Sequence, residues 1–352
     1  MKTISPDMTF EQIHDALEFT GAADWLVPVK GNAAGQMAQM PLSFTAQLGW
    51  SPEAMAEGFQ YIGGLSEAGK TICYPLYTED ELAEDPSAAQ RYLVHFSVEK
   101  KARFVITCSG GAYIGAASMI EGFPTCKEIN DLGYHAFTLN YRALKDAKAP
   151  NPINDLAAAV RFVIEHAGEL NVDTSDYAIG GFSAGGHLVG CFGTESIGWK
   201  HYGLPRPAAV MLAYPVITMK EYTHEDSRKN FLQEYAEDME MREKYSVEAQ
   251  ITAAYPAAYV WQCDKDSTVP IQNTQLLVSA LNKYGVKNEY HTFDSEQHGW
   301  GCGKGTPAEG WVKQAVALWE TQFEIEVLDE FHINDEGGKL IAQNIDIFKI
   351  IG

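Results

Sequence analysis

The sequence predicts an α/β protein built on a doubly wound, mostly parallel sheet with helices on both faces. From residue 91 onward, apolar runs of strand length, rich in Val, Ile and Phe, alternate with segments of helical length. Strands that alternate with helices in this way form parallel βαβ units, whose site lies at the carboxyl ends of the strands. With 352 residues, 46% of them hydrophobic, the chain can bury a large core.

Residues 1 to about 90 are predicted to form an extension that packs on this core. Apolar residues at helical spacing indicate a helix from Phe10 to Phe19. A second helix is expected to begin after Ser51, which suits the N-cap position, with Pro52 in its first turn, and to end near Leu65.

Residues 91 to 322 are predicted to form the main domain. The expected strands are Tyr92 to Val98, Ala102 to Cys108, Tyr134 to Asn140, Asp176 to Ile179, Ala208 to Tyr214, Ala257 to Gln262 and Asn288 to Phe293. The expected helices are Ala117 to Leu132, Pro152 to Gly168, Ala184 to Thr194, Ile271 to Tyr284 and Trp311 to Phe323. The segment 152 to 168 has the clearest amphipathic period, so we expect it to cover the sheet.

Two segments depart from this alternation. A highly charged, helical insertion at about residues 218 to 250 follows a central strand, where a cap over the site is expected. A solvated helix face is the alternative interpretation of its charges. Residues 323 to 352 alternate apolar and polar side chains around Gly337 and Gly338, a pattern compatible with an added hairpin.

The composition restricts the partners and the compartment. Lys and Arg number 26 and Asp and Glu 47, which gives a formal net charge of −21. This charge disfavours nucleic acid and membrane partners and favours a neutral substrate, although it also fits a merely solvated surface.

The six cysteines lack zinc-site spacing and are expected to be reduced. The absence of a leader-like or membrane-spanning apolar run predicts a cytoplasmic protein. The sequence leaves open whether copies of the chain form a homo-oligomer.

The stretch Ile179 to Leu188 contains the pattern G-x-S-x-G, with Ser183 between Gly181 and Gly185. A strand before it and a helix after it place Ser183 on a strained turn that exposes its hydroxyl at the end of the sheet. The two glycines let neighbouring backbone approach the turn where a Cβ would clash. The pattern therefore predicts a nucleophilic serine.

A serine nucleophile needs a base to take its proton and a carboxylate to fix the tautomer of that base. In hydrolases of this architecture the acid and then the histidine follow the serine, each on a loop after a strand. Asp266 and His298 occupy these two positions. Asp264 is the alternative acid, but Asp266 lies four residues before Pro270, which suits the tight turn into the next helix. His187, inside the helix after the serine, is expected to pack rather than to react.

A loop of small residues, Ser109 to Tyr113, directly follows a predicted strand. Such a loop can turn consecutive backbone N–H groups toward one point, as the stabilisation of an oxyanion requires. An ordinary glycine turn is the alternative interpretation of this stretch.

Taken together, the motifs resemble the α/β-hydrolase esterases of the acetyl-xylan esterase and feruloyl-esterase-like group, relatives of the hormone-sensitive-lipase type. The resemblance covers roughly residues 91 to 322 and rests on Cys108 to Tyr113, Gly133 to Arg142, Gly181 to Leu188, Asp266 to Pro270 and His298-Gly299.

The resemblance implies roles for individual residues. Ser183 would be the nucleophile, His298 the base and Asp266 its orienting acid. The backbone N–H groups of Gly111, Ala112 and Ala184 would form the oxyanion hole. The chain departs from the family in having Ser109 and Ala112 where Pro or His, and Gly, are usual, and the methyl group of Ala112 is expected to narrow the pocket.

The predicted function is that of a serine carboxylesterase that hydrolyses short-chain or carbohydrate-linked esters, acetyl or feruloyl, through an acyl-enzyme and without metal or cofactor. Its substrate would be a small-molecule or oligosaccharide ester. Tyr113 and Trp300 are expected to wall the substrate subsite, unless they only pack the loops. An arylformamidase-like amidase and a non-catalytic small-molecule binder on a hydrolase fold stay open as alternatives.

Overall fold

The computed structural model describes residues 1 to 30, 35 and 37 to 330, and within them eight strands form one sheet in the order β1-β2-β4-β3-β5-β6-β7-β8. The strands are β1 (Cys73–Pro75), β2 (Tyr92–Phe96), β3 (Ala102–Cys108), β4 (His135–Asn140), β5 (Val172–Phe182), β6 (Ala209–Ala213), β7 (Ala257–Cys263) and β8 (Asn288–Phe293). β2 pairs antiparallel with both β1 and β4, and every pairing from β4 to β8 is parallel. The predicted doubly wound, mostly parallel sheet is therefore confirmed.

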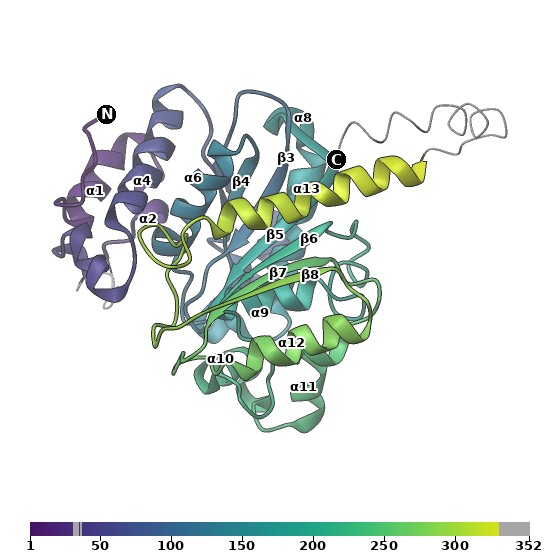
Figure 1. Cartoon of the computed structure of the whole chain (residues 1–352). Coiled ribbons are helices and arrows are strands. Elements are labelled where there is room, and N and C mark those ends of the chain that lie inside the picture. Colours follow the sequence, from purple (N-terminus) through teal and green to yellow (C-terminus); the bar gives the residue numbers. More distant parts are fainter. Residues whose placement is uncertain (31–34, 36, 331–352) are drawn as a thin grey trace, which may run out of the picture.

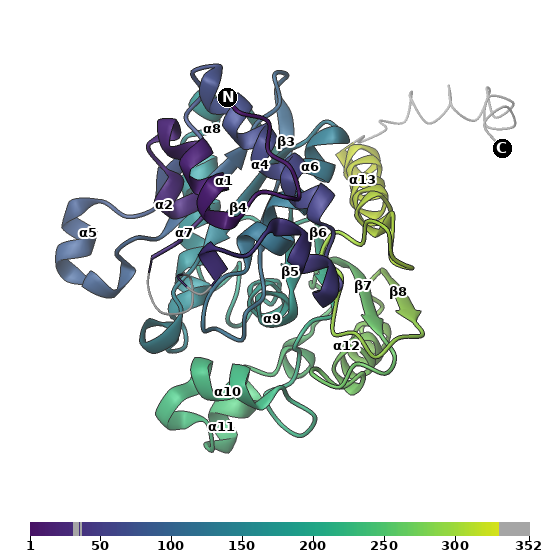
Figure 2. The ribbon, with the colours of Figure 1, turned by 90° about the vertical axis from the view of Figure 1, so that its left-hand side faces the viewer.

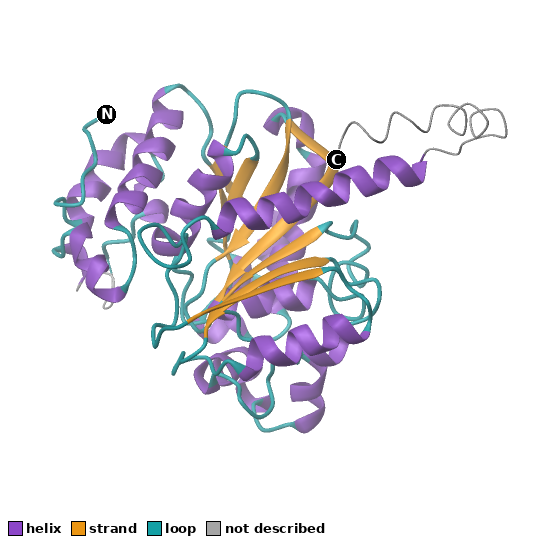
Figure 3. Cartoon of the chain, viewed as in Figure 1, coloured by secondary structure: helices purple, strands orange, loops and turns teal. Residues whose placement is uncertain are grey.

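Helices cover both faces of this sheet (Figures 1 and 3). They are α1 (Phe10–Leu17), α2 (Ala23–Leu26), α4 (Pro52–Glu67), α5 (Glu79–Glu84), α6 (Phe123–Asp131), α7 (Asn151–Glu165), α8 (Ala167–Leu170), α9 (Ser183–Phe192), α10 (Glu225–Leu232), α11 (Met239–Lys244), α12 (Gln272–Lys283) and α13 (Trp311–Glu330). Ser51 caps α4 as predicted, since its side chain accepts the N–H of Ala54. The helix expected from Ala117 begins instead with a π-helical turn, Ser118–Gly122.

The core lies in two layers because alternate side chains of each strand point to opposite faces. On one face, Phe104 and Ile106 of β3 pack with residues of α7, α9 and α12. On the other face, Val105 packs with α6, α13 and the N-terminal helices α1 and α4. Figure 2 shows these N-terminal helices, in purple, beside α6. The first 90 residues thus share a continuous core with the sheet rather than forming a core of their own.

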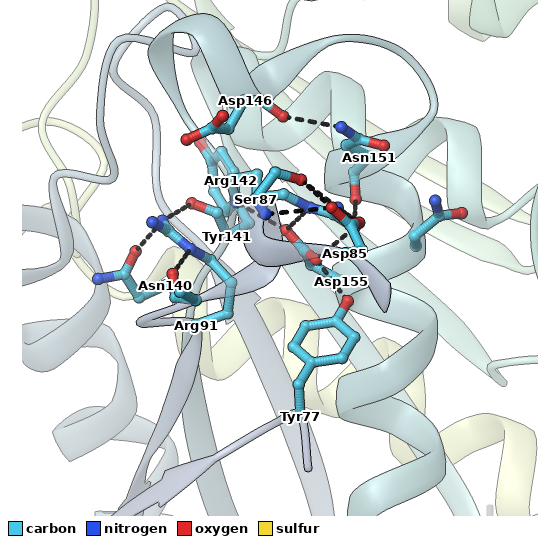
Figure 4. A network of polar contacts seen from close by, with 12 residues as sticks. Tyr77, Asp85, Ser87, Arg91, Asn140, Tyr141, Arg142, Asp146, Asn151 and Asp155 are labelled. Carbon is cyan, nitrogen blue, oxygen red and sulfur yellow. Dashed lines mark hydrogen bonds and ion pairs between the residues drawn. The ribbon is translucent and has the colours of Figure 1, made fainter. Parts of the chain in front are cut away.

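A buried polar network fixes the end of β4 (Figure 4). The guanidinium of Arg142 lies 2.9 Å from Asp155 of α7 and 2.6 Å from Asp85, which follows α5. The carboxylate of Asp155 also accepts the backbone N–H of Arg142 and the hydroxyl of Tyr77. Because one carboxylate satisfies three donors, the pair can be buried without leaving an unpaired charge. The Gly133 to Arg142 motif is therefore structural at its carboxyl end.

Two other features of the chain concern its thiols and its C-terminal helix. All six cysteines are free, and all but Cys73 are buried, as predicted. α13 continues to Glu330, beyond the predicted end at Phe323, and residues 331 to 352 of the predicted hairpin lie outside the described residues. In the part of the chain that the structure describes, no helix combines the length and apolar character needed to cross a membrane.

Candidate active site

Ser183 occupies the sharp turn between β5 and α9. Its backbone has a φ of 50°, in the left-handed region that non-glycine residues rarely adopt. A Cβ at Gly181 would overlap the carbonyl of Gly185, and a Cβ at Gly185 would overlap the carbonyl of Cys108. Both glycines of the G-x-S-x-G pattern are therefore needed for the close approach of backbone around the serine.

The structure brings Ser183, His298 and Asp266 into one hydrogen-bonded chain. His298 Nε2 lies 2.8 Å from Ser183 Oγ, and His298 Nδ1 lies 2.7 Å from Asp266 Oδ2. The Asp266 side chain is fully buried, whereas 27% of the His298 side chain is exposed. The imidazole thus reaches the solvent-facing side of the site while its carboxylate partner is shielded from water.

Asp266 is held in place by its own hydrogen bonds. Its Oδ1 accepts the backbone N–H groups of Thr268 at 2.8 Å and Val269 at 3.0 Å, and its Oδ2 accepts from Gln262 Nε2 at 3.3 Å. Asp264 is exposed, and the one hydrogen bond that it accepts within the described residues comes from the N–H of Ser295, at 3.3 Å. Of the two carboxylates weighed from the sequence, the geometry places Asp266 against the histidine.

The loop after β3 has an unusual backbone. Gly111, Ala112 and Tyr113 have φ values of 127°, 53° and 59°, so three consecutive residues depart from the common regions. The loop is held by Asn230 of α10, whose side chain donates to the Ala112 carbonyl at 2.8 Å. Among the described residues, the N–H groups of Gly111 and Ala112 have no hydrogen-bond acceptor. Ala184 lies in the first turn of α9, where N–H groups have no acceptor within the helix.

Tyr113 and Trp300 lie in the core. Tyr113 is fully buried, and its hydroxyl donates to His187 Nδ1 at 2.7 Å. Trp300 is 6% exposed and stacks on Trp261 with 6.0 Å between ring centroids. In this structure both rings pack the loops around the site, as in the alternative that the sequence left open. His187 also packs, as expected, since its Nε2 contacts the carbonyl of Tyr245 at 2.8 Å.

Sequence reasoning missed two residues beside the site, Glu121 and Tyr214. The Glu121 carboxylate accepts the N–H of Gly110 at 2.6 Å and the hydroxyl of Tyr214 at 2.8 Å. Burial raises the pKa of Glu121. A single acidic residue inside a predicted helix carries no spacing signal, so only the π-helical turn and the fold reveal its contacts.

The fold and this geometry together define the class. A doubly wound sheet with a strained serine after β5, an acid after β7 and a histidine after β8 is the arrangement of an α/β hydrolase. The chain belongs to the BD-FAE family, whose model matches residues 93–281.

Similar proteins include carbohydrate-active hydrolases. The chain is 29% identical over 286 residues to endo-1,4-beta-xylanase B of Butyrivibrio fibrisolvens, covering 77% of this chain and 44% of that protein. It is 31% identical over 221 residues to an acetylxylan esterase of Xylanibacter ruminicola, covering 62% of this chain and 45% of that protein. The chain thus spans less than half the length of both relatives.

A solved structure matches over a larger share of its own length. The acetyl ester-xyloside bifunctional hydrolase from Caldicellulosiruptor lactoaceticus is 31% identical with a TM-score of 0.63, and the match covers 71% of this chain and 95% of that one.

Proposed function

We propose that this chain is a serine carboxylesterase acting on acetyl esters of carbohydrates. The observation that carries the proposal is the hydrogen-bonded chain from Ser183 through His298 to Asp266, at 2.8 and 2.7 Å. The names of its relatives, an acetylxylan esterase and an acetyl ester-xyloside hydrolase, support the acetyl group and the sugar. Feruloyl esters are the alternative substrates for the same catalytic residues.

The reaction would proceed in two halves. Ser183 Oγ attacks the ester carbonyl as His298 Nε2 takes the serine proton, and Asp266 stabilises the resulting imidazolium. The tetrahedral oxyanion would accept hydrogen bonds from the backbone N–H groups of Gly111, Ala112 and Ala184. Collapse breaks the bond to the alcohol, which leaves with the proton from His298. A water molecule, deprotonated by His298, then hydrolyses the acyl-serine and returns the enzyme to its starting state.

We also propose a domain organisation for the chain. Residues 91 to 322 would be the catalytic domain, with the insertion at 218 to 250 as a cap and residues 1 to 90 as a packed extension. The bond from Asn230 to the Ala112 carbonyl supports the cap, because it ties the insertion to the oxyanion loop.

A substrate panel tests the proposal. Acetyl, butyryl, octanoyl and feruloyl esters are assayed beside acetylated xylan and N-formylkynurenine, with Ser183→Ala as the control for background hydrolysis. Release of acetate from acetylated xylan and from small acetyl esters is expected. Hydrolysis of N-formylkynurenine with no ester activity would show an amidase instead, and no turnover of any substrate would contradict the proposal.

A further inference from the structure

We propose that Glu121 is a positioning residue that fixes the oxyanion loop and, through Tyr214, the loop that carries His298. The inference rests on the proposed function, since it assigns a role within the same site. It draws on contacts from three separate elements: the π-helical turn, the loop after β3 and the end of β6.

The first contact is with the oxyanion loop. Glu121 Oε2 accepts the N–H of Gly110 at 2.6 Å, a length typical of a strong, charge-assisted hydrogen bond. A Cβ added to Gly110 would lie 2.9 Å from the Cβ of Ser183 and 3.3 Å from Glu121 Oε2. The Gly110 backbone is thus confined between the carboxylate and the nucleophilic serine. Any movement of Glu121 shifts the peptide that leads into Gly111 and Ala112.

The second contact is with the histidine loop. The hydroxyl of Tyr214 donates to Glu121 Oε1 at 2.8 Å and accepts the N–H of Gly301 at 3.1 Å. The Tyr214 ring meets the His298 ring at 5.1 Å between centroids and an angle of 70°, and a Cβ at Gly299 would overlap the Tyr214 ring. Tyr214 therefore contacts the catalytic loop at the His298 ring and at the backbone that follows it.

The burial of Glu121 makes a purely structural explanation costly. Glu121 is 5% exposed, and no Lys or Arg forms an ion pair with it within the described residues. Burying a carboxylate without a cation costs free energy even when hydrogen bonds satisfy its oxygens, so an apolar side chain of similar size would serve a purely structural role better. Both of its hydrogen bonds lead to loops of the site. One carboxylate thereby sets the separation between the oxyanion loop and the base.

The test compares variants of the full chain on p-nitrophenyl acetate. Glu121→Ala removes both contacts and is expected to lower kcat about 100-fold with KM changed less than threefold, because positioning acts in the transition state. Glu121→Gln keeps an acceptor for Gly110 and is expected to recover kcat to within about tenfold of the original protein. Tyr214→Phe keeps the ring but breaks the link and is expected to lower kcat about tenfold.

Matched controls separate positioning from general damage. Glu195→Gln alters a partly buried carboxylate outside the proposed cap that contacts Lys200 and Thr252. Tyr259→Phe, on β7, removes a hydroxyl that bonds Gln314 of α13. Both controls are expected to keep kcat within twofold. Circular dichroism and Tm establish that each variant is folded.

Three results would overturn the inference: a folded Glu121→Ala protein with kcat within twofold of the original, an effect confined to KM, or no recovery in Glu121→Gln. If Glu121→Ala does not fold, unchanged kcat in Glu121→Gln and Tyr214→Phe overturns it. Failure of the proposed function looks different, because the unaltered protein itself would then turn over no ester, and the inference would fall with it.

Discussion

Ser183 and its two partners come from three distant parts of the chain, yet each could be predicted from local sequence. The glycines beside Ser183, the strand before each loop and the order of acid and histidine were sufficient signals. Glu121 and Tyr214 could not be found in the same way. Their contacts depend on how the π-helical turn meets the end of β6, which is a property of the folded chain.

At this scale we predict a hierarchy among the proposed catalytic residues. Ser183→Ala is expected to lower kcat on the order of 10⁴-fold or more, His298→Ala about as much, and Asp266→Asn somewhat less, because the three act as one unit. Steady-state kinetics on an acetyl ester measure the losses. Asp264→Asn serves as the control and is expected to stay near the original rate; if it is worse than Asp266→Asn, the wrong acid has been assigned.

Ala112 allows a prediction about substrate size. Its methyl group stands in the proposed oxyanion loop at a φ of 53°, where a glycine would leave more room. We expect acetyl esters to exceed octanoyl esters at least tenfold in kcat/KM, equivalent to about 1.4 kcal/mol, and Ala112→Gly to reduce that ratio. A p-nitrophenyl ester series measures it. Faster turnover of octanoyl esters, or an acetyl-to-octanoyl ratio of kcat/KM that Ala112→Gly leaves unchanged, would show that the site is open.

At the scale of elements, α9 carries a buried histidine whose charge state matters for stability. Burial lowers the pKa of His187 to about 4, since both of its ring nitrogens face the interior. Nε2–H donates to the Tyr245 carbonyl and Nδ1 accepts from Tyr113, so the neutral ring suits its surroundings. Burial also lowers the pKa of His95 and of His135, which contact each other between β2 and β4.

These histidines predict a stability that depends on pH. Their pKa is lower in the folded than in the unfolded chain, whose histidines titrate near 6.5, so stability is full above that value and falls as the pH decreases. For His187 the total loss on going below pH 4 is about 3 kcal/mol.

Urea unfolding at pH 5 to 8 measures this dependence. His187→Gln is expected to flatten it, while His201→Gln, which alters an exposed histidine, is expected to leave it unchanged. Equal slopes in all three proteins would refute the assignment to His187.

For the whole molecule, the sequence predicted the seven longer strands because each is a stretch of strand length with β-branched, aromatic or other apolar residues, followed by a turn signal. β1, three residues including Pro75, was missed because so short a strand gives no periodic pattern. The strand order was also beyond the sequence, since β2 crosses to pair with β4 through contacts far apart in the chain. The N-terminal extension was expected to pack on the domain, but its contact with the histidine loop was not foreseen.

That contact predicts an effect of the extension on catalysis. Gly49 has a φ of 88°, and a Cβ there would lie 3.2 Å from Trp300 Cδ1 and 3.5 Å from Gln297 Oε1, on either side of His298. Gly49→Ala is expected to cost about 1 to 2 kcal/mol of stability and also to lower kcat several-fold. Gly285, with a φ of 68° and open space around it, provides the control. Gly285→Ala should lose similar stability and no activity; equal kcat in both variants would contradict the contact's role.

The most direct test of the account is where a fluorophosphonate reacts. Such a probe reports an activated serine, since its phosphorus reacts rapidly with a hydroxyl whose proton an adjacent base takes during the attack. Peptide mass spectrometry of the labelled protein is expected to find one modification, on Ser183, and to find none in Ser183→Ala and far slower labelling in His298→Ala. A label on another residue, or an unlabelled protein that still hydrolyses esters, would contradict the assignment of Ser183 as the nucleophile.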